Sequence, residues 1–236
     1  MRCLLCHEQM MVKPTWRRIF LQEEGKLVCE QCESGFELLG GEQCNGCARV
    51  LEQKWTSETE NGLCLDCERW QKHPTASQLL KRNLSLYAYN ERIKDCVSLY
   101  KFQGDAEIGR YFSMKMKRAY QSHFQAYSPV LMPLSEDRLR ARGFNQVELM
   151  TSEWLVPVVA LGRTTGEQQS KKNRSARIHQ VTHSPFFVEK GQISIKPLQK
   201  FVLIDDVYTT GTTVRQAAQT LIEQGATHVE SLTLCR

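Results

Sequence analysis

From residue 83 onward, short apolar runs alternate with segments in which apolar residues recur at helical spacing. The apolar runs predict strands at residues 84–89, 129–132, 157–161, 201–204 and 227–234. The helical spacing predicts helices that begin near Asn90 and Asp105, a helix at residues 145–154, and a helix at residues 213–223 that ends before Gly225. Strands that alternate with helices predict an α/β fold with a mostly parallel sheet flanked by helices.

The helix after Asn90 shows how these boundaries are assigned. An Asn side chain caps free backbone N–H groups, and Ile93, Val97 and Tyr100 then recur at i, i+4 and i+7. Residues 101–104 interrupt this pattern, and residues 162–184 are polar enough to predict a long loop.

The first third of the chain has a different composition. Eight of the ten cysteines lie between Cys3 and Cys67, and they form four Cys-x-x-Cys pairs. Two such pairs supply the four thiolates that hold one Zn²⁺ at about 2.3 Å per sulfur, with no position left for water. The sequence therefore predicts two structural zinc sites. In chain order they are Cys3, Cys6, Cys29 and Cys32, and Cys44, Cys47, Cys64 and Cys67.

Other arrangements of these cysteines stay open. An interleaved pairing of the knuckles uses the same ligands, and an iron–sulfur cluster is also held by four thiolates. Disulfides are disfavoured, because no apolar signal segment follows the first residues and the chain is expected to stay in the cytoplasm. No apolar run reaches the 18 residues of a membrane span.

Charge and composition divide the 236 residues into two domains. Residues 1–75 carry 9 basic and 12 acidic side chains, whereas the remaining residues have a net charge of +8. We expect a zinc-binding module at residues 1–72, a polar linker around residues 70–77, and an α/β domain at residues 78–236. The acidic module is better suited to contact with a protein than with nucleic acid.

The chemistry concentrates after the clearest predicted strand. Asp205 and Asp206 follow this strand directly, and the next turn is rich in Thr and Gly. Such a turn at a helix N-terminus offers N–H groups and hydroxyls to a phosphate, and two carboxylates suit ribose hydroxyls or a Mg²⁺ ion. The combination predicts a 5-phosphoribosyl ligand. The alternative is an ordinary turn with capping residues.

This segment resembles the phosphoribosyl diphosphate (PRPP) signature of type I phosphoribosyltransferases. Together with the cysteine pairs, residues 100–105 and residues 142–146, it makes the whole chain similar to the ComF family of bacteria. The resemblance implies a phosphoribosyltransferase-like fold and a role in natural transformation, in which single-stranded DNA crosses the cytoplasmic membrane. It also implies the translocase ATPase ComFA as a partner, contacted through the zinc module and able to recruit the protein to the inner face of the membrane.

The resemblance assigns roles to residues. Asp205 and Asp206 would face the ribose of PRPP, which binds with Mg²⁺, and Thr209, Thr210, Gly211, Thr212 and Thr213 would hold its 5-phosphate. The loop at residues 133–143 takes the pyrophosphate position, with Arg138, Arg140, Arg142 and Lys101 as candidate contacts. The alternatives are a solvated basic face for the arginines and a helix end for Lys101.

Residues 162–184 are the candidate mobile loop. The cations there are Arg163, Lys171, Lys172, Arg174 and Arg177, and the same set is a candidate contact for single-stranded DNA. Phe144, Phe186 and Phe187 are the nearby candidates for base stacking, although Phe186 and Phe187 also suit a core.

The leading hypothesis is a ComF-type protein that binds PRPP and assists DNA uptake. One alternative is an active phosphoribosyltransferase of nucleotide or base metabolism. Another is a non-catalytic adaptor between the translocase ATPase and DNA. No residue identifies an acceptor substrate.

Overall fold

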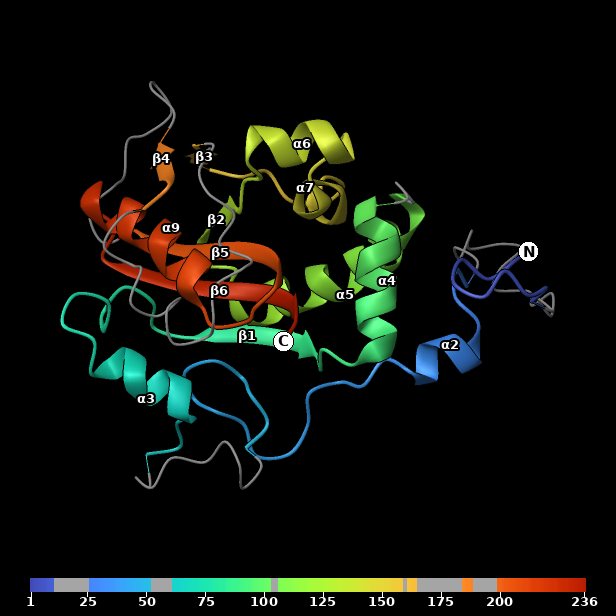
Figure 1. Cartoon of the computed structure of the whole chain (residues 1–236), viewed down its shortest axis with the longest axis horizontal. Coiled ribbons are helices and arrows are strands. Elements are labelled where there is room, and N and C mark those ends of the chain that lie inside the picture. Colours follow the sequence, from blue (N-terminus) through green and yellow to red (C-terminus); the bar gives the residue numbers. More distant parts are fainter. Residues whose placement is uncertain (11–25, 52–60, 103–105, 159–160, 165–183, 189–198) are drawn as a thin grey trace.

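The computed structural model describes residues 1–10, 26–51, 61–102, 106–158, 161–164, 184–188 and 199–236 (Figure 1). Its centre is a four-stranded sheet in the order β1-β6-β5-β2, and each neighbouring pair is parallel. The strands are β1 (Asn83–Tyr87), β2 (Ser128–Leu131), β5 (Lys200–Val207) and β6 (His228–Cys235). The predicted fold, a mostly parallel sheet flanked by helices, is confirmed.

Helices cover both faces of this sheet. The helices of the described residues are α2 (Glu30–Ser34), α3 (Leu65–Gln71), α4 (Glu91–Phe102), α5 (Ala106–His123), α6 (Glu136–Arg142), α7 (Gln146–Thr151) and α9 (Thr212–Glu223). The predicted cap of α4 is confirmed, because the Asn90 side chain accepts a hydrogen bond from the Ile93 N–H at 3.0 Å. Among the described residues, no helix combines the length and apolar composition that crossing a membrane requires.

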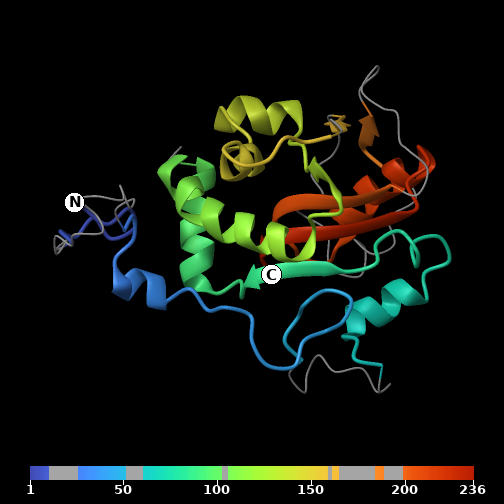
Figure 2. The same cartoon turned by 180° about the vertical axis from the view of Figure 1, so that it is seen from behind.

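The alternation of side chains along β5 builds two cores. Val202 and Ile204 pack with α4, α5 and α7 on the face nearer the viewer in Figure 2. Phe201 and Leu203 pack on the other face with α9. All four side chains are buried, so the first half of β5 belongs to both cores, whereas its carboxyl end is half-buried.

Three predictions of local structure are wrong in part. Residues 157–158 are not in a strand, and the apolar side chains of Val156 and Val158 are 85% and 50% exposed. A strand begins instead at β3 (Leu161–Arg163), which pairs antiparallel with β4 (Phe186–Val188) outside the main sheet. The helix predicted at residues 145–154 ends at residue 151. The break predicted at residues 101–104 does not begin at residue 101, because residues 101–102 still belong to α4, and residues 103–104 lie outside the described residues.

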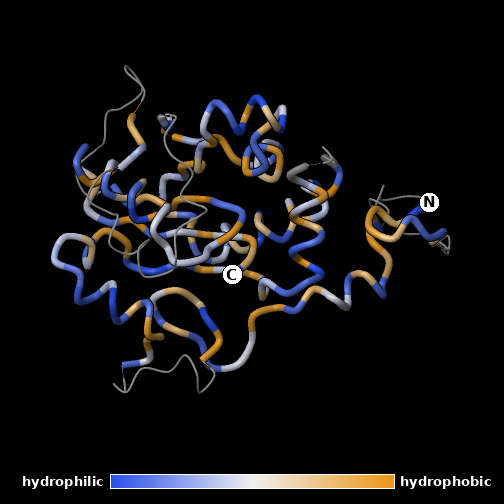
Figure 3. Tube along the Cα trace, viewed as in Figure 1, coloured by the Kyte–Doolittle hydropathy of each residue, from blue (hydrophilic) through white to orange (hydrophobic). Residues whose placement is uncertain are grey.

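The segment predicted as a basic loop contains the helix α6. Its first turn carries Glu136 and Asp137 and its last turn carries Arg140 and Arg142, which is the order that the helix dipole favours. Gly143 ends it in the left-handed conformation, at φ +80°. Figure 3 shows α6 as a mostly hydrophilic helix. A helix without an apolar face gives no apolar periodicity in the sequence, so the sequence pattern did not predict this helix.

The predicted linker is not a loose connection. Trp70 is on α3 and is only 2% exposed, and Ala76, Leu79 and Leu80 are buried in the same core as α9. Residues 70–77 are mostly polar, but Trp70 and Ala76 within them pack against residues that are distant in the sequence. The division into a module of residues 1–72 and a domain of residues 78–236 stays a prediction.

A buried acidic group marks the opposite end of the sheet from the carboxyl ends of its strands. Glu230 accepts hydrogen bonds from Arg82 at 2.5 Å, from the Tyr127 hydroxyl at 2.8 Å and from His228 at 2.9 Å. Burial raises the pKa of Glu230, but these hydrogen bonds outweigh burial and leave the pKa below its usual value. The cluster joins β6 to the segment that precedes β1 and to the turn before β2.

Candidate functional site

The two adjacent aspartates lie at the carboxyl end of β5. Asp205 and Asp206 are the sixth and seventh residues of that strand, and α9 begins at Thr212. A cavity of about 360 Å³ opens at this edge of the sheet. Its polar lining consists of Tyr89, Arg138, Arg142, Asn145, Gln146, Arg163, Asp205, Asp206, Thr209, Thr210, Thr212 and Thr213. This is the edge at which open α/β sheets bind ligands.

Residues 207–213 form the turn between β5 and α9, which we call the phosphate loop. Gly211 caps the helix at φ +79°, a conformation in which L side chains are strained. The hydroxyl oxygens of Thr210 and Thr212 lie 2.9 Å apart, and both residues are buried. Because α9 has 12 residues, its N-terminal dipole adds to these hydroxyls and favours an anion at the loop.

Three arginines, Arg138, Arg142 and Arg163, line the same cavity as this loop. Burial lowers the pKa of Arg142, with Asp206 acting in the opposite direction and Arg138 in the same direction. Burial also lowers the pKa of Arg163, again together with Arg138 and against Asp205. A guanidinium stays protonated despite such shifts. The cavity thus brings three guanidinium groups and two carboxylates together, and guanidinium groups of this kind suit an anionic ligand.

The structure brings together most of the candidate residues. Asp205, Asp206, four of the threonines, Arg138 and Arg142 line one cavity, and Gly211 forms its turn. Arg163, which was grouped with the loop cations, lines the same cavity. Arg140 points elsewhere and pairs with Glu136 at 3.4 Å. Lys171, Lys172, Arg174, Arg177 and the side chain of Lys101 lie outside the described residues.

The aromatic candidates separate into packed and exposed rings. Phe186 is buried, with the Arg163 guanidinium 5.2 Å from its ring centre, and Phe144 packs against Tyr100. Phe187 is 45% exposed on β4. Phe187 is thus the most exposed of the three rings, and Phe144 is half-buried.

Two residues that line this cavity, Tyr89 and Asn145, were not predicted as site residues from the sequence. Tyr89 follows β1 and is 46% exposed, and its place just beyond a strand end was the available signal. Asn145 was expected only to begin a helix. Its side chain also donates to the Met132 carbonyl at 3.2 Å while accepting from the Val147 N–H at 3.0 Å, so it ties the exit of β2 to α7.

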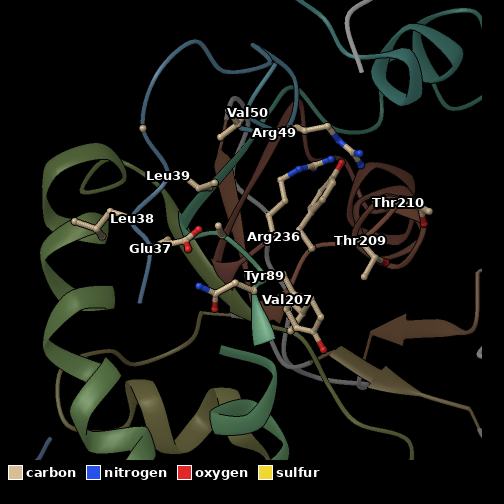
Figure 4. Close-up of a pocket in the computed structure, with 14 residues that line it drawn as sticks. Glu37, Leu38, Leu39, Arg49, Val50, Tyr89, Val207, Thr209, Thr210 and Arg236 are labelled. Carbon is tan, nitrogen blue, oxygen red and sulfur yellow. The ribbon is translucent and has the colours of Figure 1, made fainter. Parts of the chain in front are cut away.

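A second, larger cavity of about 970 Å³ adjoins the first (Figure 4). Residues 37–40 and 49–50 of the N-terminal region form one wall, and residues 88–90, 207–210 and 236 form the other. Figure 4 shows Arg49 and Arg236 in the upper part of the view, and Tyr89 with Val207 below them. Tyr89, Val207, Thr209 and Thr210 line both cavities, so the phosphate loop separates them.

The cysteines gather in two sets of four, in chain order. Cys3, Cys6, Cys29 and Cys32 form one set, and Cys44, Cys47, Cys64 and Cys67 form the other, with all sulfur atoms of a set within 4.8 Å of one another. This is the sequential pairing. Either set could hold a metal ion.

The geometry of both sets fits a tetrahedral ion. Sulfurs at about 2.3 Å from a zinc ion lie about 3.8 Å apart. The Cys6 and Cys29 sulfurs are 3.7 Å apart and those of Cys47 and Cys64 are 3.5 Å apart. Backbone N–H groups also point at the sulfurs, as from Cys64 to Cys44 at 3.2 Å. Such donors stabilise thiolates.

Comparison with known proteins gives relatives along the whole chain. No protein-family model matches it. It is 35% identical to competence protein ComFC of Bacillus subtilis over 99% of this chain and 94% of the relative. It is 34% identical to competence protein ComFC of Streptococcus pneumoniae over the full length of both chains. It is 27% identical to the DNA utilization protein YhgH of Salmonella typhi over 89% of this chain and 96% of the relative.

Proposed function

Because this chain belongs to the family of competence protein ComFC, we propose that it binds a phosphoribosyl ligand, PRPP, and assists single-stranded DNA uptake in natural transformation. The resemblance to the ComF family is thereby confirmed. Relatives named for competence and for DNA utilization support a role in DNA uptake. The ligand and the division of labour within the chain are our proposal.

One observation carries the ligand assignment. A single cavity holds the two carboxylates, the hydroxyls of the phosphate loop and three arginines. In the proposed complex the 5-phosphate lies on the phosphate loop, Asp205 and Asp206 face the ribose hydroxyls, and Arg138, Arg142 and Arg163 face the diphosphate. A bound Mg²⁺ would neutralise part of the diphosphate charge, and Asp205 and Asp206 are the side chains suited to hold it.

A calorimetric titration with PRPP tests this assignment. We expect binding that strengthens when Mg²⁺ is present. The double variant Asp205→Asn with Asp206→Asn keeps the size of both side chains but removes their charge, and we expect it to lose the Mg²⁺ effect. A matched control is Glu68→Gln with Glu91→Gln, which removes two charges from helical ion pairs that do not line the cavity. Wild-type protein without PRPP affinity would overturn the ligand assignment.

The metal sites are proposed to hold structural zinc. Each set supplies four thiolates and no open position, and small modules of this kind gain their fold from the ion. Measurement of two zinc ions per chain, with no iron, is the expected result. We assign the acidic first 72 residues to contact with the translocase ATPase ComFA. Loss of ComFA binding on Cys6→Ser, with PRPP affinity measured in parallel, would support that assignment.

The single-stranded DNA contact is assigned to the cations of residues 163–177 and to the exposed ring of Phe187. Each phosphate contact contributes about 0.7 to the slope of log affinity against log salt for single strands. The triple variant Lys171→Ala, Lys172→Ala and Arg174→Ala should therefore lower affinity and reduce the slope by up to about 2.

The matched control for this triple variant replaces three exposed, ion-paired lysines, Lys26, Lys72 and Lys94, by Ala. It removes the same number of positive charges from other surfaces. An equal loss of slope in both triple variants would contradict a local DNA site and leave only a general effect of net charge.

A second candidate function is an active phosphoribosyltransferase. The cavity of about 970 Å³ favours it, because a ligand held at the phosphate loop would have room beside it for an acceptor. Pyrophosphate release from PRPP in the presence of a nucleobase, an amine or DNA is the expected signal. PRPP binding with no release for any acceptor would favour the non-catalytic adaptor.

A further inference from the structure

Side chains that do not line the binding cavity contact the phosphate loop and hold its backbone in place. The indole N–H of Trp70 donates a hydrogen bond to the Thr210 carbonyl at 2.7 Å. Both residues are buried, and 140 positions separate them in the sequence. Because a buried carbonyl that loses its donor costs free energy, this bond fixes the path of the loop backbone next to Gly211.

Arg215 is a second fastening. Its guanidinium carbon lies 4.4 Å from the centre of the Trp70 ring, in cation–π geometry. Its Nη1 donates to the Tyr208 hydroxyl at 2.9 Å and reaches the Gly211 carbonyl at 3.4 Å. Arg215 is buried, and its two contacts join Tyr208, near the beginning of the loop, to Gly211, near its end.

Arg236 connects the loop to the second set of cysteines directly. Its guanidinium carbon lies 5.0 Å from the centre of the Tyr208 ring, and its Nη1 donates to the Cys47 carbonyl at 2.9 Å. Tyr208 is therefore held between Arg215 and a second arginine, which is anchored on a residue of the cysteine set.

Trp70 is attached to the same set through its helix. Cys64 is the N-cap of α3, Cys67 follows one turn later and Trp70 one further turn on. Residues at this spacing share one side of a helix. An ion held by Cys64 and Cys67 therefore sets the position of α3, and with it the donor that Thr210 requires.

We propose that Trp70, Arg215 and Arg236 are positioning residues through which the second cysteine set controls the shape of the phosphate loop. The expected effect on PRPP affinity rests on the proposed function, because the phosphate loop is the part assigned to the 5-phosphate. The metal at Cys44, Cys47, Cys64 and Cys67 is then a condition for phosphoribosyl affinity, although it lies outside the binding cavity.

The first test removes one donor. Trp70→Phe keeps an aromatic ring over Arg215 but deletes the indole N–H. One hydrogen bond of this kind corresponds to about a three- to tenfold loss of PRPP affinity. The matched control is Trp154→Phe, because the Trp154 indole also donates to a backbone carbonyl, that of Met150 at 2.9 Å, on the opposite face of the sheet. We expect Trp154→Phe to leave PRPP affinity unchanged.

The second test needs no ligand. Amide hydrogen exchange of a peptide covering residues 207–213 is measured in the zinc-loaded protein, in Cys67→Ser and in Cys6→Ser. We expect Cys67→Ser to accelerate exchange in this peptide, whereas Cys6→Ser accelerates exchange only around its own cysteine set. Trp70→Phe should accelerate exchange in the same peptide, and it serves as the folded alternative if Cys67→Ser does not fold.

The two tests separate the inference from the proposed function. Faster exchange in Trp70→Phe together with a wild-type protein that does not bind PRPP would retain the coupling and overturn the ligand. Unchanged exchange and unchanged PRPP affinity in Trp70→Phe, with a lowered unfolding temperature, would show a purely structural contact and overturn the inference.

Discussion

Gly211 gives a prediction whose size can be worked out from the structure. In Gly211→Ala the new Cβ would collide with the Tyr208 hydroxyl and with the Arg215 guanidinium. Left-handed backbone costs a non-glycine residue about 1–2 kcal/mol. Overpacking of a closed site costs about 1–3 kcal/mol more, because both neighbours are buried and hydrogen-bonded to each other. The expected loss of unfolding free energy is therefore about 2–5 kcal/mol.

Gly143→Ala is the matched control for the backbone contribution. Gly143 has φ +80°, against +79° for Gly211, but a Cβ there would meet nothing within 4 Å. Its expected cost is only the backbone part, about 1–2 kcal/mol. The assay is equilibrium unfolding of both zinc-loaded variants in urea. The slope of unfolding free energy against urea concentration should be the same in both variants, which shows that both undergo the same unfolding transition.

The difference between the two variants isolates the packing behind the phosphate loop. We also expect Gly211→Ala to weaken PRPP binding, since the loop must move to admit the methyl group. Equal losses of stability in Gly211→Ala and Gly143→Ala would refute the reasoning. It would mean that Tyr208 and Arg215 yield without cost and do not hold the loop.

Two further predictions concern charge. Glu230→Gln should lower the unfolding free energy at pH 7 by about 1–3 kcal/mol, and the two proteins should converge in acid. The folded pKa of Glu230 is lowered, so its contribution is present above the unfolded pKa and is lost as the pH falls through the folded value. Urea unfolding across a pH series from neutral into acid measures this, and a difference that stays constant with pH would contradict it. For the diphosphate contact, Arg142→Ala should weaken PRPP binding in calorimetry by at least about tenfold, whereas Arg140→Ala on the exposed side of α6 should not; equal effects would point to net charge alone.

The β5–α9 junction could be predicted because its information is local. An apolar run, two acidic residues and a Thr–Gly turn stand next to one another in the sequence, and each has a direct structural reason. The structure places the two aspartates and the four threonines at one cavity. The cysteine sets were predictable for the same reason, since Cys-x-x-Cys pairs are local, although their sequential grouping required the fold.

The errors arise where packing partners are distant. Residues 70–77 are polar and contain a proline, which is typical of a linker, yet Trp70 is buried against Thr210 and Arg215. Nothing near Trp70 in the sequence indicates those partners. At residues 157–158 the opposite error occurs, because an apolar run predicts a buried strand and Val158 is 50% exposed. Hydropathy alone therefore identifies neither the buried residues of a polar segment nor the exposed residues of an apolar one.

The two cysteine sets belong to two different cores of the molecule, and this determines what each can do. The first set packs with Phe36 and the core of α4 and α5, and its Cys6 is exposed. In the second set every cysteine is buried, and it packs with Trp70 and the core of α9. The first set is open to a protein partner at Cys6, and no hydrogen bond of the described residues joins it to the phosphate loop. The buried set is joined to that loop, because its helix supplies the donor to Thr210. Partner contact and ligand control are therefore expected to belong to different metal sites of the same module.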